Sequence, residues 1–474
     1  MSTRESVRRL LGTSPVDIGE LNRRAAGQAY RPEVVPPSYD PPDDIVVTDE
    51  YRRVHELLDA GCPVVFVTGN AGTGKSTLVE YLRTVLQKRL AVVAPTGVAA
   101  LNVGGSTIHS FFHLPPKIHE EDDIKLVSDR KLYQKLQLLI VDEVSMVRCD
   151  LLDSVDRFLR KNRDIEAPFG GVQMLLIGDL FQLPPVVPQR EWDVLQERGY
   201  ASPYFFSSFA LQETPLVPVE LTSVFRQADG SFVDLLNRIR IGDDVEAATA
   251  LLNGRCHSQQ HESSDITLTC TNSLADHINR RELHRLESRE YLFVGTVEGQ
   301  FALEGDRLPS PLNLTLKPGA RVMFTRNDGQ KRWVNGTLGV VREIAPERLK
   351  VQVGPGAEGQ VHDVQPVTWE TYKYRYDRTS DQIVAKVVGT YTQYPLMLAW
   401  AVTIHKSQGK TLDNVLVDLG TGAFASGQTY VALSRCRSLE GVRLARAIRP
   451  TDIICDPVIK RFYLALADTL DPSA

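Results

Sequence analysis

The stretch Gly69–Ser76 reads GNAGTGKS and decides the fold of the chain around it. It matches the pattern G-x-x-x-x-G-K-[ST], in which backbone N–H groups and a helix N-terminus hold phosphates. A continuous apolar run, 64–68 (VVFVT), precedes the stretch, and a helical pattern over 77–86 follows it. A strand, a glycine-rich loop and a helix in this order form a phosphate cradle. The sequence therefore predicts a site for a nucleoside triphosphate.

This loop supplies most of the predicted nucleotide contacts. Lys75 is expected to reach the β- and γ-phosphates, and Ser76 is expected to bind Mg²⁺. The predicted cofactor-binding residues of the loop are Gly69, Asn70, Ala71, Gly72, Thr73, Gly74, Lys75, Ser76 and Thr77. The motif predicts that a nucleoside triphosphate binds, but it does not indicate which process its hydrolysis drives.

Composition places the chain among ordinary globular proteins. It has 474 residues, 42% of them hydrophobic and 24% charged, which is enough for several domains with large cores. A net charge of −5 gives no global basic field, although a basic groove can lie on an acidic body. The sequence shows no apolar run of membrane-spanning length and no secretory or organelle-targeting pattern at its N-terminus. Six scattered cysteines are typical of a reducing compartment, so we expect a cytoplasmic protein.

Alternating strands and helices predict an α/β lobe over residues 45–215. Its strands are expected at 64–68, 90–94, 138–142 and 173–178, and all four are nearly continuous apolar runs. Such runs are typical of a parallel sheet buried on both faces, as in doubly wound folds. Residues 1–44 before this lobe are rich in proline and polar residues, so we expect a poorly ordered lead-in.

A second α/β lobe is predicted over residues 216–290 and 393–474. Helices are expected at 231–240, 273–286 and 428–434, and strands at 266–270 and 415–418. Between its two parts, residues 291–392 are rich in β-branched runs, glycines and turn signals. That composition predicts a small inserted all-β module.

Several polar side chains follow the predicted strands of the first lobe. Asp142 ends an apolar strand and is placed to hold Mg²⁺, while the adjacent Glu143 can act as general base on the attacking water. Gln182 follows the next strand and can hydrogen-bond the γ-phosphate or its water. Hydrolysis also needs positive charge on the transition state, for which Arg226 and Arg435 are candidates.

The motifs taken together resemble a known family. GNAGTGKS, APTGVAAL, STIHSFF, DEVSM, GDLFQLPPV, LTSVFRQ, TIHKSQGKTLD and YVALSRCRS occur in the order found in superfamily-one DNA helicases. The set is most similar to the petite-integration-frequency (PIF) helicases, relatives of the RecD-type helicases. The segment LLDSVDRFLRKNRDIEAPFGGVQ is similar to that family's signature stretch, and the resemblance spans residues 64–442.

The resemblance implies a fold and a division of roles. It implies two RecA-like doubly wound parallel-sheet lobes with ATP in the cleft between them, and a small inserted Src-homology-3-like β-barrel. Lys75, Glu143, Gln182, Arg226 and Arg435 take the catalytic roles, and Ser76 and Asp142 the metal. Gln408 and Gly409 are expected to face the nucleotide. Relatives read adenine with a glutamine near the position of Tyr51, which could stack on a base but cannot make that amide contact.

The same resemblance implies a track for nucleic acid. The matching positions are Thr96, Thr107, His109, Thr403, His405 and Lys406. Phe111 and Phe112 lie nearby, with core packing as the favoured interpretation. In the inserted module, residues 372–376 (YKYRY) alternate tyrosines with cations, which fits either a nucleic-acid surface or, preferably, an ordinary barrel strand with a solvated face. By analogy, a strand-separating wedge is expected near residues 113–128.

These observations predict an enzyme that needs ATP and Mg²⁺. The expected activity is a DNA helicase that moves 5′ to 3′ on single-stranded DNA and unwinds forked or structured DNA, including G-quadruplexes or RNA–DNA hybrids by analogy. We expect a nucleoid-associated, bacterial-like monomeric motor, with single-strand-binding or replication proteins as partners. Two alternatives stay open: a RecD-type subunit of a larger complex, and an ATP-switched DNA-binding or remodelling protein that does not unwind.

Overall fold

A computed structural model of the chain describes residues 45–223, 229–256, 266–301, 308–345, 348–354 and 359–470. These residues form two compact units. The first contains 45–223, 371–387 and 456–470, and the second contains the described residues of 229–370 and 388–455. The predicted lead-in, 1–44, lies outside the described residues. In the part that is described, no helix is both long enough and apolar enough to cross a membrane.

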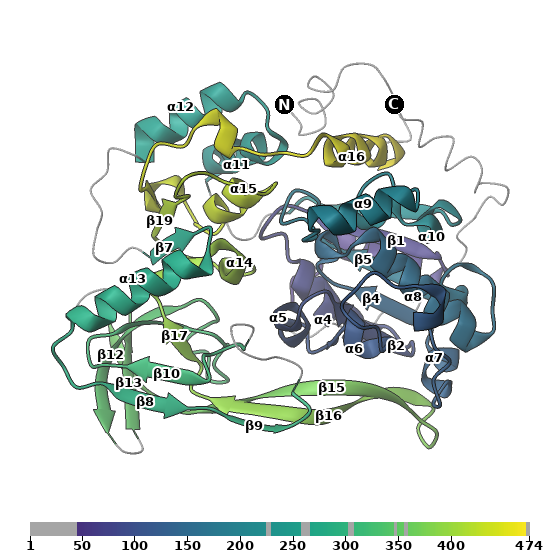
Figure 1. Cartoon of the computed structure of the whole chain (residues 1–474), viewed down its shortest axis with the longest axis horizontal. Helices are drawn as coiled ribbons and strands as arrows, with labels where there is room; N and C mark the ends of the chain where they lie inside the picture. Colours follow the sequence, from purple (N-terminus) through teal and green to yellow (C-terminus); the bar gives the residue numbers. More distant parts are fainter. Residues whose placement is uncertain are drawn as a thin grey trace. The chain divides into compact units, whose positions relative to one another are not determined.

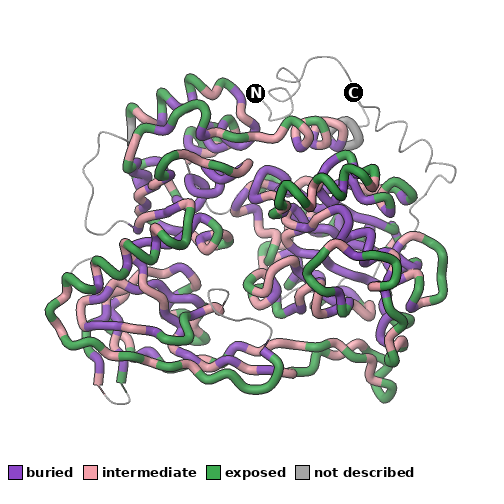
Figure 2. The backbone as a smooth tube through the Cα atoms, viewed as in Figure 1, coloured by how far each residue is buried: buried purple, intermediate pink, exposed green. Residues whose placement is uncertain are grey.

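A six-stranded parallel sheet forms the centre of the first unit (Figure 1), with strand order β3-β2-β4-β5-β1-β6. Its strands are β1 (Val64–Gly69), β2 (Leu90–Ala94), β3 (Ser106–Thr107), β4 (Leu138–Val141), β5 (Gln173–Ile177) and β6 (Leu216–Leu221). All residues of β1 and β4 are buried, as Figure 2 shows for the sheet. The continuous apolar runs of the sequence are therefore strands covered on both faces.

Helices surround this sheet. They are α3 (Asp49–Asp59), α4 (Lys75–Val85), α5 (Gly97–Asn102), α6 (Ile108–Phe111), α7 (Lys131–Lys135), α8 (Cys149–Arg163), α9 (Gln189–Glu197), α10 (Phe209–Gln212) and α16 (Pro457–Leu470). The predicted boundary between the lobes is wrong at two points. β6 pairs in register with β1, Val64 opposite Leu216, so residues 216–221 belong to the first sheet. The last helix, α16, also belongs to the first unit, where Phe462 stacks on Phe206 at 3.9 Å between ring centroids.

The second unit has a smaller parallel sheet with strand order β18-β7-β19-β20. Its strands are β7 (Ile266–Thr269), β18 (Ala401–Thr403), β19 (Val415–Asp418) and β20 (Val442–Leu444), and its helices are α11 (Gly230–Ile241), α12 (Val245–Cys256), α13 (Asn272–Arg285), α14 (Ile404–Ser407) and α15 (Gln428–Leu433). Two parallel-sheet α/β lobes were predicted, and this is confirmed. The predicted helices and strands of this unit match the observed ones to within a residue or two.

Antiparallel strands occupy the region of the predicted all-β insertion. They form the sheets β10-β8, β14-β13-β12-β11-β17 and β15-β16-β9. The strands are β8 (Tyr291–Val294), β9 (Thr296–Gly299), β10 (Asn313–Leu316), β11 (Arg321–Phe324), β12 (Leu338–Ala345), β13 (Arg348–Val353), β14 (Gln360–Val364), β15 (Val367–Asp377), β16 (Gln382–Gln393) and β17 (Leu396–Leu398). The module thus runs slightly past its predicted end at residue 392.

The tip of the β15–β16 hairpin, residues 371–387, belongs to the first unit. Tyr374 lies against β2, where its hydroxyl is 3.3 Å from the Val92 nitrogen, and its ring packs edge-on to Phe111 with centroids 5.5 Å apart. Asp381 near the turn pairs with Arg89 at 2.8 Å. The expected alternation of tyrosines and cations is present: Tyr374 packs on protein, whereas Lys373 and Arg375 on the other face are exposed. This fits the preferred interpretation, a strand with a solvated face, and contact with nucleic acid stays a prediction.

Candidate nucleotide and DNA sites

The glycine-rich loop between β1 and α4 has the backbone expected of a phosphate cradle. Gly72 and Gly74 adopt left-handed conformations, with φ of +86° and +83°, which glycine reaches without steric cost. The Lys75 Nζ donates to the carbonyl oxygens of Gly69 and Asn70, at 2.9 Å in both cases. The loop thus holds its own lysine, and α4 begins at that lysine. Its N-terminal N–H groups favour an anion at this point.

Two glycines allow neighbouring segments to approach closely at the carboxyl edge of the sheet. A Cβ on Gly69 would lie 2.7 Å from the carbonyl oxygen of Leu221, at the end of β6. A Cβ on Gly178, just after β5, would lie 3.0 Å from the nitrogen of Ser145. Any larger residue at either position would push the strand ends apart, so these glycines keep the polar residues at the sheet edge together.

The acidic pair follows β4 at the same edge. Asp142 is buried, and its own N–H donates to the Val93 carbonyl at 2.9 Å. Burial, together with the charge of Glu143, raises the pKa of Asp142 to about 7, and the charge of Lys75 opposes that shift. Glu143 itself is left-handed at φ +51°, an unusual conformation for a glutamate that is common at functional sites.

The oxygen atoms at this edge fit a hard divalent cation. A buried carboxylate whose charge is disfavoured gains stability from a cation, and Mg²⁺ prefers carboxylate and hydroxyl oxygens such as those of Asp142 and Ser76. The buried hydroxyls of Thr68 and Ser145 also lack a hydrogen-bond partner among the residues described. Each lies beside the site in sequence, next to Gly69 and two residues after Glu143. The residues present therefore fit the predicted metal.

Gln182 is fixed by a neighbouring carboxylate. Its Nε2 donates to Asp179 at 3.0 Å, and Asp179 also accepts from the N–H of Phe181 at 3.2 Å. Asp179 and Gln182 are both buried. Because β5 lies between β4 and β1, this loop lies between the acidic pair and the phosphate loop. The structure thus brings Lys75, Asp142, Glu143 and Gln182 to one edge of one sheet.

Tyr51 does not have the role expected of it. Its side chain is only 1% exposed, and its ring packs on that of Tyr81 with centroids 5.9 Å apart. The hydroxyl donates to the carbonyl of Gly74 at 2.6 Å. A buried ring with an occupied hydroxyl cannot stack on a base, so that hypothesis is wrong. Sequence reasoning missed the contact because the direction of a helical side chain cannot be read without the helix start at Thr48.

The three predicted DNA-contacting threonines share one local structure. Thr96, Thr107 and Thr403 each precede a helix, and their hydroxyls accept the N–H three residues on, at 3.2, 3.2 and 3.3 Å. Each follows or ends a strand of a parallel sheet, at its carboxyl edge. Helix N-termini at such edges favour phosphates. Contact with nucleic acid at these positions stays a prediction.

The other predicted track residues lie beside these caps. Burial, followed by the nearby His119 and Arg148, lowers the pKa of His109, so this side chain is neutral at neutral pH. His405 and Lys406 follow Thr403 in α14, and the His405 side chain is exposed. Phe111 and Phe112 are buried, which confirms core packing for both. The segment 113–128 is bound to α8, for example through Lys161 Nζ to the Ile124 carbonyl at 2.6 Å, and its role as a wedge stays a prediction.

In the second unit, the motifs around Gln408 and Arg435 are joined to each other. The N–H of Leu412 donates to the Arg435 carbonyl at 2.9 Å. The Arg435 guanidinium is 1% exposed and donates to the Val431 carbonyl and the Ser434 hydroxyl, both at 2.9 Å. Gly409 is exposed and left-handed at φ +77°. The roles of Gln408, Gly409 and Arg435 stay predictions, and Arg226 lies outside the described residues.

A glycine-rich loop, an acidic pair with a buried aspartate and an amide at one edge of a parallel sheet define the site of a P-loop nucleoside triphosphatase. A family model described as PIF1-like helicase matches residues 48–261. The ATP-dependent DNA helicase Pif1 of Bdellovibrio bacteriovorus is 34% identical over 436 residues, which cover 89% of this chain and 93% of that protein. The chain therefore belongs to the PIF1-like helicase family.

Solved structures agree with this assignment. Bacteroides sp. Pif1 in complex with ADP-AlF4 is 36% identical, with a TM-score of 0.83 over 90% of this chain and 98% of that one. Bacteroides Pif1 bound to single-stranded DNA is also 36% identical, with a TM-score of 0.64 over 89% and 97%. One of these structures holds ADP-AlF4 and the other single-stranded DNA, and the family expected from the motifs is confirmed.

Proposed function

We propose that this chain is an ATP-dependent DNA helicase that moves 5′ to 3′ along single-stranded DNA and unwinds forked or structured DNA. The observation that carries the proposal is the convergence of Lys75, Asp142, Glu143 and Gln182 on one sheet edge. A relative from Bdellovibrio bacteriovorus is named an ATP-dependent DNA helicase, and a solved relative was crystallised with bound single-stranded DNA.

In the proposed mechanism each side chain has one task. Lys75 leaves the carbonyls of Gly69 and Asn70 for the β- and γ-phosphates, whose charge it neutralises. Mg²⁺, held by Ser76 and Asp142, would add positive charge at the phosphates. Glu143 accepts the proton of the attacking water. Its left-handed backbone conformation sets the direction in which its Cα–Cβ bond points.

Gln182 and two arginines complete the proposed chemistry. Asp179 fixes the amide of Gln182, which can then report the presence of the γ-phosphate through a single hydrogen bond. Arg226 and Arg435 supply the positive charge that the transition state needs.

The proposed partner of both units is the phosphate backbone of single-stranded DNA. Thr96, Thr107 and Thr403 place helix N-termini at carboxyl edges, and Lys406 adds a cation beside one of them. We propose a monomeric motor that meets single-strand-binding or replication proteins on DNA. Cys62, Cys149, Cys270, Cys436 and Cys455 form no disulfide bonds with one another. They support a reducing, bacterial-like cytoplasm as its compartment.

ATP hydrolysis with and without single-stranded DNA tests the proposal. We expect DNA to stimulate hydrolysis at least tenfold, and Lys75→Ala to abolish it. Glu143→Gln should remove hydrolysis by about a hundredfold or more while nucleotide binding is retained, because only the base is lost. An ATP hydrolysis rate that is the same with and without single-stranded DNA would contradict the helicase proposal. Full activity of Glu143→Gln would favour a different base.

A further inference from the structure

The first turn of α3 contacts the end of the phosphate-binding loop directly, and it contacts the start of that loop only through the end of β6. This turn begins at Thr48, whose hydroxyl accepts the Tyr51 N–H at 3.3 Å and caps the helix. Tyr51 and Glu50 then point to different partners. Tyr51 reaches Gly74 at the end of the loop, and Glu50 reaches Thr222, beside the strand end that touches the start of the loop.

The Tyr51 hydroxyl controls the direction of a loop N–H. It donates to the Gly74 carbonyl at 2.6 Å, and that oxygen also accepts the Leu78 N–H at 2.9 Å in the first turn of α4. In a trans peptide the C=O and the following N–H point in opposite directions. A bond that fixes the Gly74 carbonyl therefore fixes the Lys75 N–H, which points away from α4 toward the phosphate side of the loop.

Glu50 provides the second arm. Its carboxylate accepts the Thr222 hydroxyl at 2.7 Å and the Thr222 N–H at 3.4 Å. Thr222 directly follows Leu221, the residue whose carbonyl would be 2.7 Å from a Cβ on Gly69. Because the end of β6 contacts Gly69 at the start of the loop, the Glu50–Thr222 hydrogen bonds that hold the end of β6 also limit movement of Gly69.

We infer that the first turn of α3 is a strut that positions the phosphate loop, with Tyr51 acting on Gly74 and Glu50 acting through Thr222. Tyr51 is then a positioning residue for the triphosphate and contributes nothing to choosing the base. This inference rests on the proposed nucleotide hydrolysis. In this inference, the α3 turn serves binding of the triphosphate, which all nucleoside triphosphates share.

The burial of Tyr51 separates this role from plain core packing. Phenylalanine would fill the same space beside Tyr81 and lose only the hydroxyl. Burial, with the charge of Glu50, raises the pKa of Tyr51 to about 12, so the hydroxyl stays a donor throughout the working range of pH. A role in packing alone predicts no effect of Tyr51→Phe on nucleotide affinity, whereas the strut predicts a loss that is equal for all bases.

The test compares Tyr51→Phe with wild type in KM for ATP and for GTP, with saturating single-stranded DNA. Inorganic tripolyphosphate serves as a probe without a base, and its binding is measured by calorimetry. We expect KM for both nucleotides, and the dissociation constant of tripolyphosphate, to rise by the same factor of about two to ten, the size of one net hydrogen bond. The ratio of kcat/KM for ATP over GTP should stay within about twofold of wild type.

Tyr81→Phe is the matched control, since it removes a hydroxyl from the stacked partner ring and leaves the Gly74 contact in place. It should match wild type in all three measurements. If Tyr51→Phe changes the ratio of kcat/KM for ATP over GTP but leaves tripolyphosphate binding unchanged, the inference is overturned in favour of a role in reading the base. If Tyr51→Phe changes none of the three measurements, the inference is also overturned, and Tyr51 serves only in core packing. An inactive wild type that still binds tripolyphosphate would reject the proposed hydrolysis and leave the strut testable by binding.

Discussion

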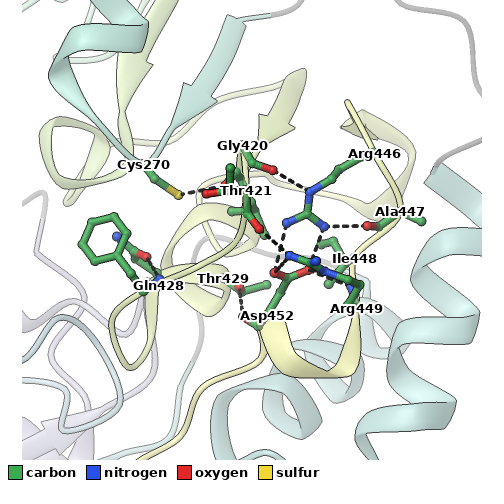
Figure 3. Close-up of polar contacts among 12 residues, drawn as sticks. Cys270, Gly420, Thr421, Gln428, Thr429, Arg446, Ala447, Ile448, Arg449 and Asp452 are labelled. Carbon is green, nitrogen blue, oxygen red and sulfur yellow. Dashed lines mark hydrogen bonds and ion pairs between the residues drawn. The ribbon is translucent and has the colours of Figure 1, made fainter.

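At the scale of single residues, Asp452 shows how one buried carboxylate organises a loop. Figure 3 shows it between two arginines: Arg446 donates to both of its oxygens, at 2.8 and 3.0 Å, and Arg449 approaches the same carboxylate. The arginines also donate to the carbonyls of Gly420 and Thr421, just after β19. Asp452 is thus the anchor through which the end of β20 holds the loop that leads into α15.

Replacing Asp452 with asparagine should lower stability in a pH-dependent way. Burial alone would raise the pKa of Asp452, but hydrogen bonds from Arg446 and Arg449 outweigh it, so the net pKa is lowered. A lowered pKa means stability that is present above the unfolded value, about 3.9, and lost as pH falls through the folded value. At pH 7 we expect a loss of about 2–4 kcal/mol.

Thermal unfolding at pH 7 and at pH 3 measures this difference. The difference in unfolding free energy between wild type and Asp452→Asn should narrow at the lower pH, because Asp452 takes up a proton in the unfolded state while the paired carboxylate of the folded state is still charged. Asp413→Asn is the control, because its pair with Arg437 is exposed on both sides and should contribute about 0.5 kcal/mol or less. A gap that is equal at both pH values would show that the charge of Asp452 does not matter.

At the scale of elements, the β15–β16 hairpin stabilises an edge of the first sheet. β3 has only two residues and pairs with Val93 and Ala94, so it leaves Val92 beyond its reach. The Tyr374 hydroxyl lies 3.3 Å from the Val92 nitrogen and 3.4 Å from its oxygen, and so substitutes for the missing strand. Buried backbone groups need such partners.

We expect Tyr374→Phe to expose this edge, with a loss of about 1 kcal/mol. Amide hydrogen exchange should speed up over 90–94 and stay unchanged over β5, which lies inside the sheet. Arg375→Ala, on the exposed opposite face of the strand, should change neither. Unchanged exchange at 90–94 would mean that the hydroxyl contact contributes nothing to this edge.

The bounds of an element could be predicted where its own apolar residues reveal its burial, but sheet membership, which depends on distant segments, could not. Runs such as 64–67 and 138–141 are apolar because both faces are covered, so their bounds could be predicted closely. Which sheet a strand joins depends on distant pairing, and 216–221 was therefore assigned to the wrong lobe. Motif spacing identified Lys75, Asp142 and Glu143, but the use of Tyr51 depends on its direction from the helix, which spacing does not carry.

At the scale of the whole molecule, the proposed motor must move in one direction along DNA. A sugar–phosphate backbone has a chemical direction, so a motor that contacts it at the predicted positions Thr96 and Thr403 would bind it with one polarity. The resemblance to PIF helicases implies 5′ to 3′ movement. The net charge of −5 means that binding depends on a local track, and salt should weaken it.

Duplexes with a single 5′ or 3′ tail test this direction under single-turnover conditions. We expect the 5′-tailed duplex to be unwound at least tenfold faster than the 3′-tailed one, with no unwinding of a blunt duplex or by Lys75→Ala. Because phosphate contacts are screened, unwinding should fall steeply between about 50 and 200 mM salt. Unwinding from 3′ tails alone would reverse the proposed direction, since the same contacts would then have to bind the strand with the opposite polarity. DNA-stimulated hydrolysis without unwinding of either duplex would instead favour an ATP-switched DNA-binding protein.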